Sequence, residues 1–257
     1  MNDTPDLRIF HDGAVALVEM NRPPQNYVDG DYMARLADGF EHLDELSSCR
    51  SIVLMSAGKH FCAGADFAGA LKSDDSVDPS TFYAHAMRLF KTNKPIVAAV
   101  NGAAVGAGLG LSLVADFRVA GPSTRFSANF NRLGFHPGFG LTLTLPRLIG
   151  EQKAALLFYT GRRISGEEAA AIGLVDEVAA EDSEIRIRAI ALAHEIAASA
   201  PLAVESTRAV LRADLHQRVA QINQHELSIQ RGQFRTADFR EGVAAMAERR
   251  LPVFCRR

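Results

Sequence analysis

The sequence predicts an α/β fold, in which strands and helices alternate through a core that is followed by a helical C-terminal region. Short apolar or β-branched runs such as Ser51–Ser56 and Ile96–Val100 alternate with segments whose apolar residues recur every three or four positions. From Glu184 onward the pattern is almost wholly helical, with Pro201 starting a new helix. This order of elements is typical of an α/β core with an α-helical appendage. We place the core at residues 1–195 and the helical region at residues 196–257.

The N-terminal third begins with a predicted β-hairpin. Leu7–Phe10 and Ala14–Met20 are β-rich runs, and His11-Asp12-Gly13 between them is a turn signal. The apolar residues of the next segment share one helix face, because they step by three or four positions: Met33, Leu36, Phe40, Leu43 and Leu46. Either Asp29 or Asp31 can cap this helix.

In the middle of the chain, the sequence predicts a further alternation of helices and strands. In order, the expected elements are a helix at about Thr81–Thr92, the Ile96–Val100 strand, a glycine-rich turn at Asn101–Gly106, a short helix at Ala107–Ala115, a strand at Phe117–Ala120 and a helix near Glu151–Tyr159. Ser165 and Glu168 have the spacing of a capping box, so a helix should begin there and end at Gly173, with a strand in the LVDEV that follows.

Composition excludes several classes of protein. In 257 residues, 47% are hydrophobic and 23% are charged, as in an ordinary globular protein. Lys+Arg number 28 and Asp+Glu 30, and this balance argues against nucleic acid as the main partner. The three cysteines are widely spaced, and no cysteine or histidine cluster has zinc spacing, so we expect no metal site. Reduced thiols and an N-terminus without an apolar signal region predict a cytoplasmic protein.

One uncharged stretch, Pro95–Ala115, just reaches the length of a membrane span. Asn101 and four glycines interrupt it, and its IVAAV run is typical of a buried strand. We therefore expect no membrane association.

Two segments share one physical design. Lys59–Phe67 and Asn101–Gly110 each carry glycine and alanine where a buried strand runs into the start of a helix. Such a turn exposes unpaired backbone N–H groups, and two of them converging on one point would form an oxyanion hole. The alternative is that the glycines only permit tight helix–strand packing. A dinucleotide fingerprint is rejected, because the spacing is GxGxG and no acidic residue lies at the distance that would hold a ribose.

With both segments in this order, the chain resembles the enoyl-CoA hydratase/isomerase (crotonase) superfamily. The resemblance spans nearly the whole chain and rests on five ordered motifs: FCAGADF, KPIVAAVNGAAVGAGLGLSLVADFRVA, LPRLIG, GRRISGEEAAAIGLVDEV and ADFREGVAAMAERRLPVF. It implies a crotonase-like spiral of ββα units with a C-terminal helical trimerisation region, assembled as a homotrimer or homohexamer. It also implies an acyl-CoA lyase or isomerase whose substrate is an acyl-CoA thioester. Coenzyme A would enter as part of the substrate, with no other cofactor.

The resemblance also places the site. The amides of Ala65 and Ala107 fall at the family's oxyanion-hole positions, and the surrounding residues would bind substrate: Ala63, Gly64, Asp66, Phe67 and Gly106. Lys72 could serve an adenine-side phosphate. Asp66 could instead cap a helix that begins there.

The sequence departs from the family at its carboxylates. The two glutamates of the family's hydratases fall at Gly110 and Phe130, and an aspartate used by its dienoyl isomerases and dehalogenases falls at Gly138. Because water addition to an enoyl thioester needs a base and an acid, the sequence predicts chemistry other than standard hydration.

Other side chains near the predicted site could take part in the reaction. His136 is the obvious titratable base, unless it is a hydrogen-bonded structural group. Asn129, Phe130 and Phe139 would line the acyl site, or else serve as turn and core residues. Isomerisation, decarboxylation and thioester hydrolysis fit these parts. A non-catalytic acyl-CoA-binding oligomer is the alternative, because the glycines remain while the carboxylates are lost.

Overall fold

The computed structural model describes residues 4–66 and 78–257. Its main sheet has six strands in the order β1-β2-β3-β4-β6-β9, and all neighbours are parallel except the β1–β2 hairpin. The strands are β1 (Leu7–Asp12), β2 (Val15–Met20), β3 (Ser51–Ser56), β4 (Ile96–Val100), β6 (Phe117–Ala120) and β9 (Glu177–Val178). A second, three-stranded sheet joins β5 (Ala103–Val105), β7 (Arg125–Ser127) and β8 (Arg163–Ser165).

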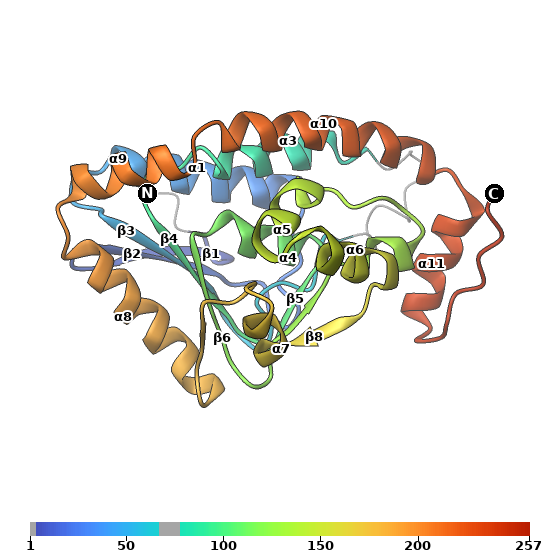
Figure 1. The fold of residues 1–257 in the computed structure, drawn as a ribbon, viewed down its shortest axis with the longest axis horizontal. Helices are drawn as coiled ribbons and strands as arrows, with labels where there is room; N and C mark the ends of the chain where they lie inside the picture. The colour runs from blue at the N-terminus through green and yellow to red at the C-terminus, as the bar shows by residue number, and fades with distance from the viewer. Residues whose placement is uncertain (1–3, 67–77) are drawn as a thin grey trace.

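The helices cover both faces of the main sheet (Figure 1). The α-helices are α1 (Gly30–Glu45), α3 (Ser80–Leu89), α4 (Ala107–Val114), α5 (Leu141–Ile149), α6 (Glu151–Thr160), α7 (Gly166–Ala171), α8 (Ile185–Ala197), α9 (Pro201–Leu211), α10 (Leu215–Gln233) and α11 (Ala237–Ala247). Two short 3-10 helices are η1 (Asn129–Leu133) and η2 (Asp182–Glu184). This is the predicted α/β architecture with a helical C-terminal region.

Alternation along the central strands builds two apolar layers. In β3, Ile52 and Leu54 belong to the large core beneath α1 and α3, whereas Val53 and Met55 face the layer covered by α8. The central strands are buried on both sides, and this explains why their sequences are continuously apolar.

Local signals set most of the boundaries that the sequence predicted. Asp29, not Asp31, caps α1 by accepting a hydrogen bond from the Tyr32 amide. The Ser165–Glu168 capping box is present at the start of α7. The uncharged stretch 95–115 forms β4, β5 and α4, so it is strand and short helix as expected. Within the described ranges no single helix is both long and apolar enough to cross a membrane; only α8 with its preceding turn, joined to α9 across a bend of 106°, reaches those criteria as a pair.

Asp116 ties the C-terminal helices to the core. Its carboxylate accepts hydrogen bonds from the Ile96 amide, from Arg208 Nε at 2.9 Å and from an Arg212 guanidinium nitrogen at 2.8 Å. The two arginines lie at the end of α9, from which α10 runs back along α3 and α5 (Figure 1). The position of α10 relative to the core is therefore fixed by charged hydrogen bonds.

Candidate functional site

The two glycine- and alanine-rich segments run side by side. Cys62 and Ala104 form a parallel bridge, in which the Cys62 amide donates to Ala103 O at 2.9 Å and the Val105 amide donates to Cys62 O at 3.0 Å. Each segment then meets a glycine with positive φ, 123° at Gly64 and 55° at Gly106. A β-branched or bulky residue is strained in that region, so glycine is required where the pairing ends.

The amides of Ala65 and Ala107 follow these glycines. Val28 pairs with the first segment by donating to Gly64 O and accepting from the Asp66 amide. In a parallel pair, Val28 bonds to the two neighbours of Ala65 and not to Ala65 itself. The N–H of Ala65 therefore points away from Val28. Ala65 and Ala107 each lie three residues beyond the bridged pair Cys62–Ala104, one in either segment.

Neither amide is used by the fold in the part of the chain that the structure describes. No hydrogen bond from Ala65 N or Ala107 N to another described residue is present. Ala107 is the first residue of α4, so its N–H lies at the positive end of that helix. Each of the two neighbouring segments therefore has one backbone N–H that the described fold leaves without an acceptor.

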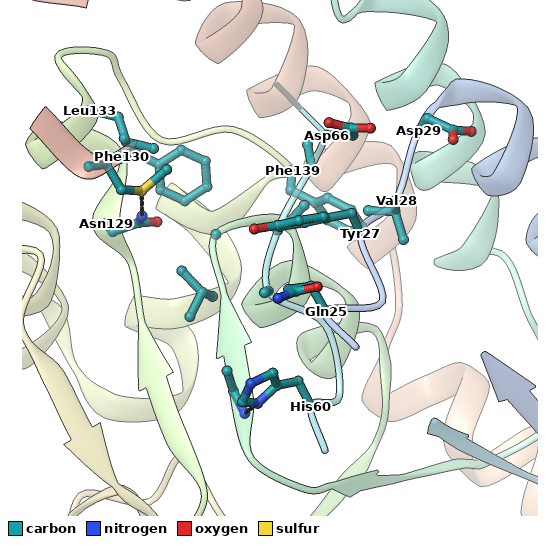
Figure 2. Close-up of a pocket in the computed structure, with 18 of the residues that line it drawn as sticks. Gln25, Tyr27, Val28, Asp29, His60, Asp66, Asn129, Phe130, Leu133 and Phe139 are labelled. Atoms are coloured by element: carbon teal, nitrogen blue, oxygen red, sulfur yellow. Dashed lines mark hydrogen bonds between the residues drawn. The ribbon is translucent and has the colours of Figure 1, made fainter. Parts of the chain in front are cut away.

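Both amides border a cavity of about 910 Å³. The predicted site residues that line it are Ala63, Gly64, Ala65, Asp66, Gly106, Ala107, Asn129, Phe130 and Phe139. Figure 2 shows Asn129, Phe130 and Leu133 on one wall and Tyr27, Val28 and Asp66 on the opposite side. Phe67 and Lys72 lie outside the described residues. The structure thus brings nine of the predicted residues together.

A phenylalanine ring packs against Gly110, and Phe130 is itself aromatic; these are the two positions to which the family resemblance assigns the hydratase glutamates. Phe139 is fully buried with φ 67°, and a β-carbon added at Gly110 would lie 2.5 Å from its Cγ. Phe130 packs edge-to-face on Phe135, with ring centroids 5.5 Å apart. These contacts leave no room for a longer side chain at position 110 and make the acyl end of the cavity apolar.

Tyr83 fills the space beside Gly138. A β-carbon at Gly138 would come 2.0 Å from the Tyr83 hydroxyl, which accepts a hydrogen bond from Gln230 Nε2 at 3.1 Å. Burial raises the pKa of Tyr83, so it stays protonated. Position 138 is glycine in the sequence, and the Tyr83 hydroxyl occupies the space that an aspartate side chain there would need.

His136 does not reach the cavity. It is absent from the described lining residues, and its backbone is held by α10: its amide donates to Gln233 Oε1 at 2.6 Å, and its carbonyl accepts from Gln230 Nε2 at 2.8 Å. Its Nδ1 lies 2.7 Å from Pro137 O. Because a carbonyl only accepts, Nδ1 carries the hydrogen there. The structure therefore does not bring the His136 side chain among the described residues that line the cavity with Ala65 and Ala107.

Several lining residues were not singled out in the sequence. Lys59, Arg125 and Arg163 give one end of the cavity a positive charge, and Val243 and Met246 of α11 help to close it. These basic residues are scattered over more than 100 positions. Lys59 and Arg163 lie within motifs quoted for other reasons, and Arg125 lies outside all of them. Arg250, near the C-terminus, is not among the described lining residues and pairs with Glu241 and Glu248.

His60 also lines the cavity at this basic end. Its Nδ1 accepts a hydrogen bond from the Ala103 amide at 3.2 Å. Burial lowers the pKa of His60, and the charges of Lys59 and Arg163 lower it further. The imidazole is thus held neutral, with Nε2 carrying its proton.

Cys62 lies beneath the loop and is not a nucleophile. It is fully buried, and its thiol lies 3.6 Å from Gly64 O. Burial raises its pKa to about 12, so the reactive thiolate does not form near neutral pH. Within residues 4–66 and 78–257, no three His, Cys, Asp or Glu side chains gather as a metal site.

Comparison with known proteins agrees with this architecture. The model of the enoyl-CoA hydratase/isomerase family matches residues 11–257. A probable enoyl-CoA hydratase of Mycobacterium tuberculosis is 39% identical over 223 residues, covering 84% of this chain and 85% of the relative. A short-chain enoyl-CoA hydratase of Clostridium acetobutylicum is 31% identical over 245 residues, 93% of each chain. The crystal structure of an enoyl-CoA hydratase/isomerase from Pseudoalteromonas atlantica superposes with a TM-score of 0.88 at 31% identity, covering 97% of this chain and 100% of that one. The chain therefore belongs to the enoyl-CoA hydratase/isomerase family, with the crotonase fold.

Proposed function

We propose that this protein is an acyl-CoA enzyme that stabilises a thioester enolate or oxyanion on the amides of Ala65 and Ala107, and that it does not carry out standard hydration. The observation that supports the proposal is the pair of unpartnered amides at one cavity. Each preorganised donor of this kind lowers a barrier by about 3–4 kcal/mol.

The charge distribution supports a CoA ester as the ligand. Lys59, Arg125 and Arg163 line one end of the cavity, where they would meet the phosphates of coenzyme A, while the far end is lined by phenylalanines. An acyl chain directed into that end would bring its carbonyl past Ala65 and Ala107.

Standard hydration requires an acid and a base at the double bond. Gly110 and Phe130 supply neither, and Phe139 fills the space at position 110. Reactions that develop negative charge on the thioester oxygen remain: isomerisation, decarboxylation and thioester hydrolysis, among which a product screen chooses. We further propose a homotrimer or homohexamer that works in the cytoplasm.

Replacing Ala107 by proline tests the proposal, because proline removes this N–H and is tolerated at the first position of a helix. Ala107→Ser, which keeps the N–H, is the matched control. The substrates are a panel of enoyl-, 2-carboxyacyl- and saturated acyl-CoA esters, with products identified by mass spectrometry. We expect Ala107→Pro to lower turnover by about 10²–10³ while CoA-ester binding persists. Rapid hydration of crotonyl-CoA by the wild type, or binding of esters without any product, would refute the proposal; the second result would identify a non-catalytic acyl-CoA-binding protein.

A further inference from the structure

The imidazole of His60 joins the two segments that carry the amides. The Val105 amide bonds to Cys62 O, and two residues earlier a regular parallel pair would repeat that bond from Ala103 N to His60 O. The carbonyl of His60 is already occupied by two donors, Asn26 Nδ2 at 2.6 Å and a serine hydroxyl at 3.0 Å. The Ala103 amide donates to His60 Nδ1 instead. The side chain of His60 thus completes a rung of the pairing that its own backbone leaves open.

The backbone is shaped for this bond. Gly102, directly before Ala103, has a φ of 56°, and a β-carbon there would lie 2.1 Å from Lys59 O and 2.8 Å from His60 Nδ1. Any side chain at position 102 would therefore push the two segments apart. Glycine at this position lets the second segment approach closely enough for the imidazole to hold it.

The bond exists only while the imidazole is neutral. In the protonated ring both nitrogens donate, so two N–H groups would face each other where His60 Nδ1 and Ala103 N now lie 3.2 Å apart. The charges that act on the ring are those of Lys59 on its own loop and Arg163 of β8, both cations. Arg125 of β7 lines the same end and donates to two carbonyls of the turn before β7. No carboxylate in the described ranges forms an ion pair with the ring, so nothing there offsets the lost bond.

The loss of this bond would affect one amide more than the other. Ala103 opens β5, which ends at Val105 just before Gly106 and Ala107. The strand that leads to Ala107 would therefore lose a bond at its start, whereas the neighbours of Ala65 stay bonded to Val28. An oxyanion hole works only when both donors already lie where the negative oxygen will form. A misplacement of about 1 Å can cost about 10²-fold in rate.

We propose that His60 is a positioning residue, whose neutral imidazole holds the Ala107 amide in place relative to the Ala65 amide, and that protonation of His60 separates them. This inference rests on the proposed function, since the two amides must bind the thioester oxygen. The oxyanion site is then assembled at neutral pH and comes apart in acid, without any contact between His60 and the reacting atoms.

Infrared spectroscopy tests the proposal without knowledge of the reaction. Butyryl-CoA with ¹³C at its thioester carbonyl would be bound to the protein at about pH 8 and about pH 5, because the carbonyl stretch falls in frequency when two N–H groups polarise the bond. In His60→Asn the Oδ1 atom takes the place of Nδ1 as acceptor and does not titrate, and His60→Leu removes the acceptor. His42→Asn is the matched control, because His42 is exposed on α1 and is not among the described lining residues.

We expect the carbonyl frequency of the wild type to be lowered at the higher pH and to return toward that of the free ester in acid. His60→Asn should keep the lowered frequency at both pH values, His60→Leu should lack it at both, and His42→Asn should behave as the wild type. With a substrate that the enzyme turns over, His60→Leu should lower kcat about 10- to 100-fold with little change in KM, and His60→Asn should restore it.

Three results would overturn the inference: a wild-type carbonyl frequency that is the same at both pH values, a normal frequency in His60→Leu, or an acid-induced change that persists in His60→Asn. A wild type that binds butyryl-CoA at the higher pH with no lowering of the carbonyl frequency, or that does not bind it, would instead refute the proposed function, and the role of His60 would fall with it.

Discussion

The ring of Phe139 packs against the backbone of Gly110, so closely that a β-carbon at position 110 would lie 2.5 Å from Cγ of the phenylalanine. Phe139 keeps this position although its φ of 67° lies in the left-handed region that bulky residues avoid. The two residues form one packing unit: the glycine makes room for the ring, and the ring closes the acyl end of the cavity.

A double-mutant cycle tests this unit. Gly110→Ala should lower the free energy of unfolding by about 1–3 kcal/mol, because overpacking forces the ring to move. In a Phe139→Ala background the same change should cost much less, since the space is already free. Chemical denaturation of the four proteins measures the coupling; equal costs in both backgrounds would contradict the contact.

Glu226 holds the other side of this wall. Its buried carboxylate accepts hydrogen bonds from Gly140 N at 2.7 Å, Thr142 N at 3.0 Å, Thr142 Oγ1 at 2.6 Å and Asn223 Nδ2 at 3.2 Å. Glu226→Gln turns an amide NH₂ toward these donors and should cost about 1–3 kcal/mol. Glu195→Gln, at an exposed position of α8, should be neutral. Thermal and denaturant unfolding would show the difference, and a neutral Glu226→Gln would mean that the carboxylate does not anchor α5.

His60 makes the stability of the folded protein depend on pH. Its pKa is lowered in the fold from the usual 6.5, chiefly by burial, so the unfolded chain takes up a proton at a higher pH than the folded one. The stability that His60 contributes is therefore complete above pH 6.5 and is lost as the pH falls below that value.

Comparison with a variant isolates this contribution from those of the other histidines. The free energy of unfolding of the wild type should fall more steeply below pH 6.5 than that of His60→Gln, which does not titrate. Parallel slopes for the two proteins between neutral pH and pH 5 would contradict a neutral His60 bonded to the Ala103 amide.

The basic end of the cavity predicts salt-dependent binding. Lys59→Ala, Arg125→Ala and Arg163→Ala should each weaken binding of a CoA ester by about three- to ten-fold at low salt, with a smaller loss at high salt, because exposed charges are screened. Arg250→Ala, which removes a cation paired with Glu241 and outside the cavity, serves as the control. Calorimetry at two ionic strengths provides the measurement; losses as large for Arg250→Ala would remove the argument for a phosphate-binding end.

Local signals carried most of the fold prediction. The cap at Asp29, the capping box at Ser165 and the apolar strands depend on residues near one another in sequence, and the structure has all three. The two matching glycine- and alanine-rich turns raised the possibility that their amides converge, and the structure brings the two segments together through the pairing of Cys62 with Ala104. The site roles assigned to Ala65 and Ala107 stay predictions until turnover is measured.

Long-range contacts account for what the sequence did not predict. His136 was a reasonable base by residue type, but Gln230 and Gln233, more than 90 positions away, hold its backbone outside the cavity wall. Tyr27 and His60 enter the cavity because of pairings with distant segments. Tyr27 lies in no pattern that marks a site, and in the Lys59–Phe67 segment that contains His60 the sequence pointed to backbone amides and not to the imidazole. The packing of the Phe139 ring against Gly110 becomes visible only when both residues are placed in three dimensions.

Helix α10 holds the residues on either side of Phe139, because Glu226 accepts from the Gly140 amide and Gln230 donates to His136 O, although α10 lies far from the amide-bearing loops in sequence. The segment that carries Phe139 is thus held in place by residues remote in sequence from both amide-bearing loops. Substitutions confined to α10 can therefore move Phe139 and change the shape of the cavity while the loops that carry Ala65 and Ala107 keep their own sequence and contacts.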